Sequence, residues 1–84
     1  NPFNMETTIS YSLPEATGIK LVIYNTHGQI IDIIDAGQKA AGTHRISWTG
    51  RDTNGTIVPS GVYLLKLYSS NPKTIATRKL VLLK

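Results

Sequence analysis

The chain has 84 residues, of which 40% are hydrophobic and 17% charged, and this length and ordinary composition fit one globular domain over residues 1–84. It contains no cysteine, which excludes disulfides and Cys-based metal sites, and no apolar run approaches the roughly 18 residues needed to span a bilayer. The net charge of +4 comes from nine Lys/Arg and five Asp/Glu that are scattered along the sequence, so no nucleic-acid partner is expected.

The elements expected in the first half of the chain are short β-strands. Residues 8–13 alternate polar and apolar side chains with a period of two, which is typical of a half-buried strand. Residues 19–24 carry apolar groups on both faces and are expected to be more buried. Residues 29–35 hold four Ile, and Asp32 and Asp35 cannot both obey strict alternation, so a β-bulge or an early strand end is expected there.

The second half continues in the same way. Residues 36–42 are read as a connector of small residues, and residues 43–48 alternate again. Residues 56–58 could form a short strand, and residues 62–69 and 74–84 are expected to form the last two. About seven short strands separated by turn signals predict an all-β fold, an immunoglobulin-like antiparallel β-sandwich.

No residue pattern indicates a catalytic or metal site. The two histidines, His27 and His44, are seventeen positions apart, whereas a metal site needs three or four converging ligands. Ser47, His44 and Asp52 could be assembled on paper into a triad, but nothing resembles a nucleophile elbow and Ser47 fits an outward strand position. We therefore expect that the chain is not an enzyme and binds no cofactor.

Two binding alternatives stay open. The stretch RDTNG, with Asp52 and Asn54, is rich in oxygen ligands, although its spacing is not that of an EF-hand loop, and Asp52 is better explained as an acceptor that fixes a turn. A glycan-binding module would show several exposed aromatic side chains. Trp48 and Tyr63 fall on predicted inward faces, whereas Tyr24 is not settled by the pattern.

Four segments carry a resemblance to a known family: NPFN…TTISYSLPEA, LVIYNTHGQII, AGTHRISWTGRDTNGTIVPSGVYLLKL and ATRKLVLLK. Together they resemble the C-terminal sorting domain of type IX secretion substrates (Por secretion tail, type A). The part from Trp48 to Leu67 is also similar to the immunoglobulin-like domain of the flagellar hook-capping protein. Met5 and Thr49 depart from the usual sorting-domain pattern, where Pro and Asp are common.

The sorting-domain resemblance implies a non-catalytic domain that targets a secreted multidomain protein through the type IX system to the cell surface. Implied partners are the secretion machinery, a sortase-like peptidase and an N-terminal cargo domain of the same chain. The implied location is secreted or at the outer-membrane surface, after export through the periplasm. The chain lacks an initiator Met and is expected to be part of something longer.

The resemblance also implies which residues carry the recognition signal. A terminal strand can pair with a receptor edge by β-augmentation, so its deletion from Leu80 onward is expected to abolish export and to destabilise the domain. Phe3 is expected to anchor the start of the domain against the sandwich. The expected recognition residues are Tyr24, Gly28, Gly61, Tyr63, Lys79, Leu80, Val81, Leu82, Leu83 and Lys84.

Two other functions remain as alternatives. One is an accessory immunoglobulin-like spacer or carbohydrate-binding module of a secreted glycan-active enzyme. The other is a structural assembly domain of the hook-cap type. The sequence upstream of this domain would best separate these alternatives from the sorting function.

Overall fold

The computed structural model describes residues 6–70 and 73–83, apart from the side chain of Thr74. The expected anchoring role of Phe3 and the expected recognition role of Lys84 lie outside the described residues. Six strands form within the described ranges, and no helix there is long and apolar enough to cross a membrane. The strands are β1 (Thr7–Leu13), β2 (Thr17–Tyr24), β3 (Ile30–Lys39), β4 (Gly42–Trp48), β5 (Gly61–Ser70) and β6 (Lys73–Leu82).

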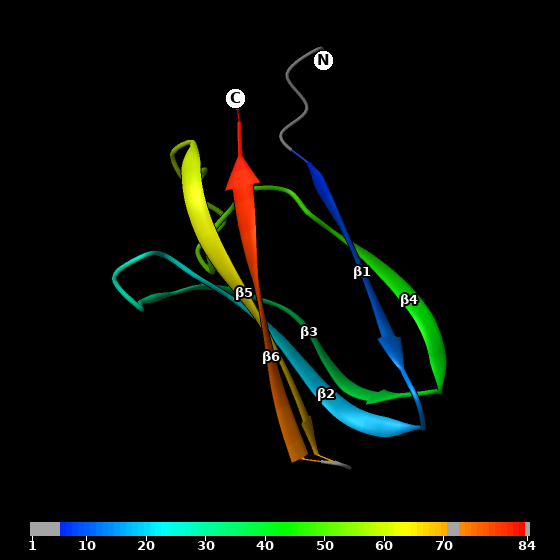
Figure 1. Cartoon of the computed structure of the whole chain (residues 1–84). Coiled ribbons are helices and arrows are strands. Elements are labelled where there is room, and N and C mark those ends of the chain that lie inside the picture. The colour runs from blue at the N-terminus through cyan, green and yellow to red at the C-terminus, as the bar shows by residue number, and fades with distance from the viewer. Residues whose placement is uncertain (1–5, 71–72, 84) are drawn as a thin grey trace.

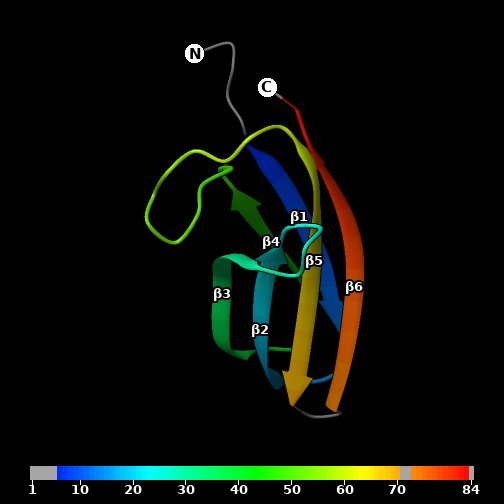
Figure 2. The ribbon, with the colours of Figure 1, turned by 90° about the vertical axis from the view of Figure 1, so that its left-hand side faces the viewer.

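The strands form two layers. A four-stranded antiparallel sheet has the order β3-β2-β5-β6, and a two-stranded antiparallel sheet pairs β1 with β4 (Figure 1). Figure 2 shows the four-stranded sheet lying in front of β1 and β4. The inner face of each sheet is the side turned towards the other sheet, and the outer face is the side turned away. The expected antiparallel, immunoglobulin-like sandwich is confirmed.

The core fills the space between the two inner faces. Alternation along each strand supplies it, because successive side chains of a strand point to opposite faces. The smaller sheet contributes Ile9, Tyr11, Leu13 and Trp48, as its pattern predicts. The larger sheet and the β4–β5 loop complete the cluster with Ile19, Leu21, Ile23, Val58, Tyr63, Leu65 and Leu82.

Strand β3 is irregular where the sequence predicts it. The β2–β3 register shifts twice, between Leu21 and Val22 and between Ile23 and Tyr24, so the expected β-bulge is confirmed. The shifts leave Ile31 and Ile34 partly buried and packed against the core. An extra residue in one strand therefore lets this Ile-rich edge strand turn more apolar groups inward than strict alternation would allow.

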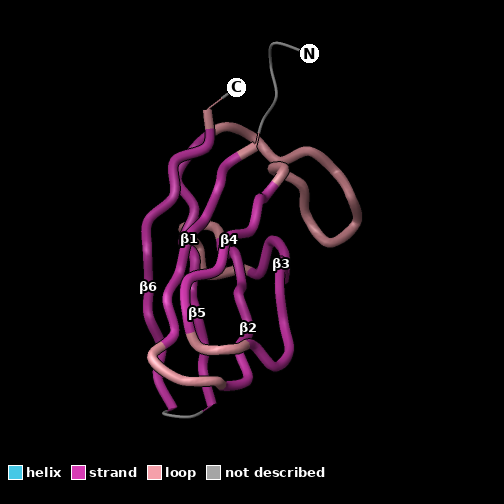
Figure 3. Tube along the Cα trace, turned by 90° about the vertical axis from the view of Figure 1, so that its right-hand side faces the viewer, coloured by secondary structure: helices cyan, strands magenta, loops and turns pink. Residues whose placement is uncertain are grey.

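Two boundaries differ from the sequence prediction. Residues 36–39 belong to β3, because Ala36 and Lys39 pair with β2, so the expected connector over residues 36–42 is too long. Residues 56–58 do not form a strand, and only Ile57 makes an isolated bridge with Arg51. These two residues belong to the loop between β4 and β5, which projects from one end of the sandwich (Figure 3).

The two sheets are also joined by a polar contact. Nη1 of Arg78 in β6 donates a hydrogen bond to the carbonyl oxygen of Ser10 in β1, over 3.0 Å. Both strands lie at the edges of their sheets. The contact therefore links the two layers at the side where β1 and β6 approach one another.

Candidate interaction surface

The structure separates the residues that were expected to form a recognition signal. Tyr63 lies in the core, where its ring meets Trp48 edge to face with centroids 5.3 Å apart. Gly28 occupies a turn with φ of +83°, a conformation that favours glycine. Tyr24 lies on the outer face, and Gly61 begins β5. These four residues form no common site.

The last strand divides its side chains between two faces. Leu82 is buried, and Leu80 is partly buried against the core. Val81 and Leu83 are exposed, and Lys79 is exposed as well. This division follows from the alternation of side chains along a strand. No finding tests a recognition role for these residues, so that role stays a prediction.

Tyr63 has a structural explanation. Its hydroxyl donates a hydrogen bond to the carbonyl oxygen of Pro59, four residues earlier, and burial raises the pKa of the phenol. Trp48, next to it, donates from Nε1 to the carbonyl oxygen of Arg51 over 3.0 Å. Both aromatic side chains lie in the core, as the alternation of their strands predicts. Their hydrogen bonds also hold the two ends of the β4–β5 loop.

The oxygen-rich loop is fixed by Asp52. Its Oδ1 accepts hydrogen bonds from the main-chain N–H groups of Asn54 and Thr56, over 2.9 and 3.0 Å. Its own N–H donates to the carbonyl oxygen of Thr56, and the guanidinium of Arg51 donates to the carbonyl oxygen of Gly55. The expectation that Asp52 accepts main-chain bonds is confirmed, and one carboxylate oxygen is already used in the turn.

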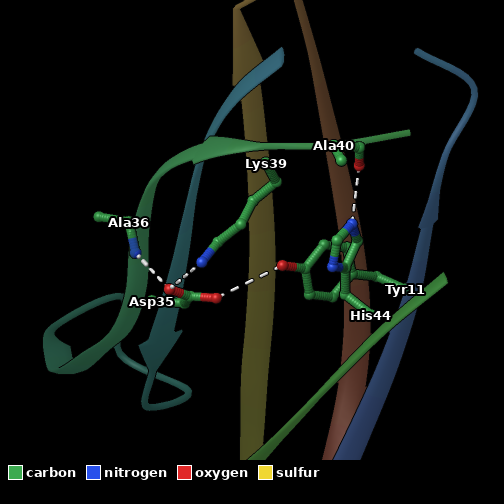
Figure 4. Close-up of polar contacts among 6 residues, drawn as sticks. All are labelled: Tyr11, Asp35, Ala36, Lys39, Ala40 and His44. Carbon is green, nitrogen blue, oxygen red and sulfur yellow. Dashed lines mark hydrogen bonds and ion pairs between the residues drawn. The ribbon is translucent and has the colours of Figure 1, made fainter. Parts of the chain in front are cut away.

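Polar side chains meet where β3 turns into β4 (Figure 4). Tyr11 donates to Oδ2 of Asp35 over 3.4 Å, and Oδ1 of Asp35 forms an ion pair with Nζ of Lys39 at 3.2 Å. His44 stacks on Tyr11 with centroids 5.3 Å apart, and its Nε2 lies 2.7 Å from the carbonyl oxygen of Ala40. Burial and the carboxylate of Asp35 both raise the pKa of Tyr11.

The polar groups of this cluster are engaged with one another and with the main chain, which is typical of a contact that stabilises the fold. The imidazole of His44 faces a main-chain carbonyl and a ring, while the carboxylate of Asp35 faces an ammonium and a phenol. Ser47 pairs with Thr8 and is exposed, so it points away from the inner side on which His44 stacks against Tyr11. Within residues 6–70 and 73–83, no group of three His, Cys, Asp or Glu side chains could hold a metal ion.

The outer face of the larger sheet carries a paired arrangement of tyrosine and lysine. The hydroxyl groups of Tyr24 and Tyr68 are hydrogen-bonded over 2.6 Å, and this bond, followed by burial, raises the pKa of Tyr24. Nζ of Lys66 lies 5.5 Å from the centroid of the Tyr24 ring, and Nζ of Lys20 lies 5.8 Å from that of Tyr68. Each lysine therefore makes a cation–π contact with a tyrosine of the neighbouring strand.

Sequence reasoning missed this face. It treated the basic residues as scattered, whereas the register brings Lys20 and Lys66 to the same side of adjacent strands. The signal was present in the alternation, because each of these lysines stands between two inward-facing apolar residues. The missing information was which strands are neighbours.

Together, the sandwich and the structural use of its polar side chains define an immunoglobulin-like domain. The family model for the FlgD Ig-like domain matches residues 3–73, which is most of the chain. The chain belongs to this family. The similarity to the hook-capping domain that residues 48–67 suggest is thus confirmed, and it extends well beyond that segment.

Curated relatives agree with the family. The chain is 32% identical over 59 residues to "Basal-body rod modification protein FlgD" of Salmonella typhimurium, with 70% of this chain and 25% of the relative covered. The FlgD protein of Escherichia coli K12 is also 32% identical over 59 residues, with 26% of its length covered. The chain therefore spans about a quarter of the length of the curated relatives that it matches.

Solved structures share the fold. FlgD from Pseudomonas aeruginosa superposes with a TM-score of 0.73 at 27% identity, covering 92% of this chain and 60% of that one. FlgD from Xanthomonas campestris, whose structure is described in terms of hook capping, gives 0.72 at 16% identity, covering 95% and 59%. PorZ, a surface component of the type IX secretion system of Porphyromonas gingivalis, gives 0.59 at 21% identity, covering 92% and 11%.

These findings correct the function expected from the sequence. Neither the family nor the curated relatives are type IX sorting domains, so the sorting function and the glycan-enzyme module are both wrong. The expected partners, which were the type IX machinery, a sortase-like peptidase and a cargo domain, are wrong for the same reason. The PorZ likeness shows a shared fold alone.

Proposed function

We propose that this chain is a structural, non-catalytic domain of a FlgD-type protein, and that it provides binding surface during assembly of the flagellar hook or rod. The observation that carries the proposal is the match of the FlgD Ig-like family over residues 3–73, with FlgD relatives 32% identical over 59 residues. The names of the relatives refer to basal-body rod modification and to hook capping.

The chemistry of the described residues supports a structural role. Two of the carboxylates that could do acid–base work are engaged in holding the fold: Asp35 by Lys39 and Tyr11, and Asp52 by main-chain N–H groups. The surface instead offers exposed aliphatic side chains beside lysines, as at Val81 and Ile75. Such surface suits non-covalent contact with another protein.

The test is a domain exchange. The Ig-like domain of FlgD in Salmonella typhimurium is replaced by this chain, and hooks are counted by electron microscopy alongside swimming in soft agar. We expect hooks to form, because a domain of the same family and fold presents comparable surfaces. A chimera that accumulates to the normal level and is folded, yet forms no hooks, would overturn the proposal.

A matched control tests whether hook formation needs a domain of this family or only a domain of this fold. The immunoglobulin-like domain of PorZ has the same fold as this chain, but it is 21% identical to it. In the same exchange we expect the PorZ domain to be produced without supporting hooks. If both domains restored hooks equally, the domain would act only as a spacer, and a specific role in assembly would be excluded.

As part of this proposal, we keep the expectation that the domain acts outside the cytoplasm. It is compatible with a flagellar assembly role, and the absence of cysteine makes the fold indifferent to an oxidising compartment. Protease accessibility of the chimera on intact cells would check it. Protection from added protease even after the outer membrane is permeabilised would contradict it.

A further inference from the structure

The outer face of the sheet β3-β2-β5-β6 gathers positive charge. Strand pairing brings four lysines to this face, although they are up to 59 positions apart in the sequence. They are Lys20, Lys66, Lys73 and Lys79. None of the chain's five acidic residues stands there. Asp32 and Asp35 are paired with the inner-face residues Ile23 and Leu21, and the others lie outside the four strands, at Glu6, Glu15 and Asp52.

The same face exposes aliphatic side chains around the tyrosine pair. Val62 pairs with Val81, and their exposed fractions are 41% and 52%. Ile75 is 60% exposed beside Tyr68, and Ile33 is 46% exposed beside Val22. An exposed apolar surface that is interspersed with charge of one sign is typical of a protein-binding surface.

One end of the face is hollowed. A depression of about 400 Å³ is lined by Gly18, Lys20, Tyr68, Ser70 and Lys73. Lysines line it from both β2 and β6, at Lys20 and Lys73. A carboxylate side chain entering here would meet two lysines, so the hollow suits an acidic group of a partner.

Two other occupants fit less well. A second copy of this chain would bring four lysines against four lysines without an intervening carboxylate, and like charges across an interface are costly. Nucleic acid is favoured by free aromatic faces and by arginine. Here, lysines already lie over the rings of Tyr24 and Tyr68, and the three arginines of the chain, Arg45, Arg51 and Arg78, lie off this face.

We propose that this outer face docks an acidic protein surface that also carries aliphatic side chains. Carboxylates of the partner would pair with Lys20 and Lys66 at the centre, and its aliphatic groups would cover Ile33 and Ile75. The proposal deepens the proposed function and rests on it only for the idea that the partner is a subunit of the same assembly. The complementarity itself comes from the lysines and the absence of acids on this face.

The test uses the 84-residue chain labelled with ¹⁵N and three soluble probes. The probes are a peptide alternating Glu and Val, its counterpart alternating Ser and Val, and single-stranded oligothymidine. We expect the Glu peptide to shift amide signals of β2, β5 and β6, to bind more weakly as salt is raised, and to bind more tightly than the other two. The proposal would be overturned by shifts centred on β1 and β4, by tighter binding of oligothymidine, or by dimerisation through the outer face of the larger sheet.

Variants locate the binding. Lys20→Gln with Lys66→Gln should weaken binding of the Glu peptide about two- to thirtyfold, which is the range expected for the loss of two exposed ion pairs. Ile33→Ser with Ile75→Ser should weaken it without changing its salt dependence. Arg45→Gln, which removes an exposed charge from the other sheet, is the matched control and should leave binding unchanged. Equal losses in the control and the lysine variant would overturn the proposal.

This test contains no flagellar component. Its failure would therefore leave the result of the domain exchange standing. Conversely, a failed exchange with intact binding of the Glu peptide would reject the flagellar role but keep the acidic docking face.

Discussion

The hydroxyl of Tyr63 donates a hydrogen bond to the main-chain carbonyl of Pro59, the residue four positions before it. The ring of Tyr63 is buried in the core, so the bond ties the start of β5 to the preceding loop. A single side chain thereby joins the packing of the sandwich to the conformation of the loop that leads into it.

Removing this hydroxyl should destabilise the domain modestly. Tyr63→Phe keeps the buried ring, so we expect the free energy of unfolding to fall by only about 1 kcal/mol, the usual net value of one hydrogen bond. Urea unfolding monitored by the fluorescence of Trp48 would measure the change. An unchanged midpoint would mean that the bond contributes nothing to stability. Tyr63→Ala, which also empties the ring's place in the core, should cost about 3–5 kcal/mol.

The last strand offers a pair of neighbouring leucines with opposite surroundings. Leu82 is 3% exposed and Leu83 is 76% exposed. We expect Leu82→Ala to lower the free energy of unfolding by about 2–5 kcal/mol, because it leaves a cavity in the core. Leu83→Ala is the matched control and should stay within about 0.5 kcal/mol of the parent chain. Similar losses of unfolding free energy for both variants would contradict the burial of Leu82 and the exposure of Leu83.

The turn at Asp52 should tolerate an amide better than a methyl group. Asp52→Ala leaves the N–H groups of Asn54 and Thr56 without their acceptor, and we expect a loss of about 1–2 kcal/mol. Asp52→Asn keeps an accepting oxygen and should lose less. Thermal unfolding of both variants with and without Ca²⁺ is the measurement. A large Ca²⁺-dependent rise in the Tm of the parent chain would instead make the loop a calcium site.

Alkaline pH should destabilise the domain. Burial and the Asp35 carboxylate raise the pKa of Tyr11, the bond to Tyr68 raises that of Tyr24, and burial raises that of Tyr63. The folded state therefore holds its phenolic protons more tightly than the unfolded state, whose tyrosines titrate near pH 10. The stabilisation is complete below about pH 10 and is lost as the pH rises through the folded pKa values.

Urea unfolding between neutral pH and strongly alkaline pH would measure this loss. Tyr24→Phe removes one of the three tyrosines whose pKa is raised and should make the decline above about pH 10 shallower than in the parent chain. Lysine deprotonation affects both proteins alike, so the comparison isolates the tyrosine. A variant that declines as steeply as the parent chain would contradict the assignment for Tyr24.

Local alternation was enough to predict the inward side chains and the irregular strand. Ile9, Tyr11 and Leu65 are buried as their spacing implies, and the misfit of Asp32 and Asp35 correctly indicated a bulge. These features depend on neighbours along the chain, because the period of a strand fixes which side chains share a face.

Features that depend on partners far away in sequence could not be predicted in this way. Residues 36–39 are small and polar, yet pairing with β2 keeps them in a strand, which shows that tertiary pairing overrides weak strand propensity. The four lysines of the outer face come together only because β2 lies beside β5 and β5 lies beside β6. Local patterns also could not decide between the two families that the sequence resembles, whereas the family match over residues 3–73 could.

The strand order also has a consequence for how the chain folds. β1 and β4 pair with one another across residues 14–41, and the β2–β3 hairpin lies between them in sequence. The hairpins β2–β3 and β5–β6 close short loops, whereas the smaller sheet must close a long one, which costs more chain entropy before any contact forms. The two hairpins are therefore expected to form early, and β1 to join β4 late, as the step that sets the folding time of the domain.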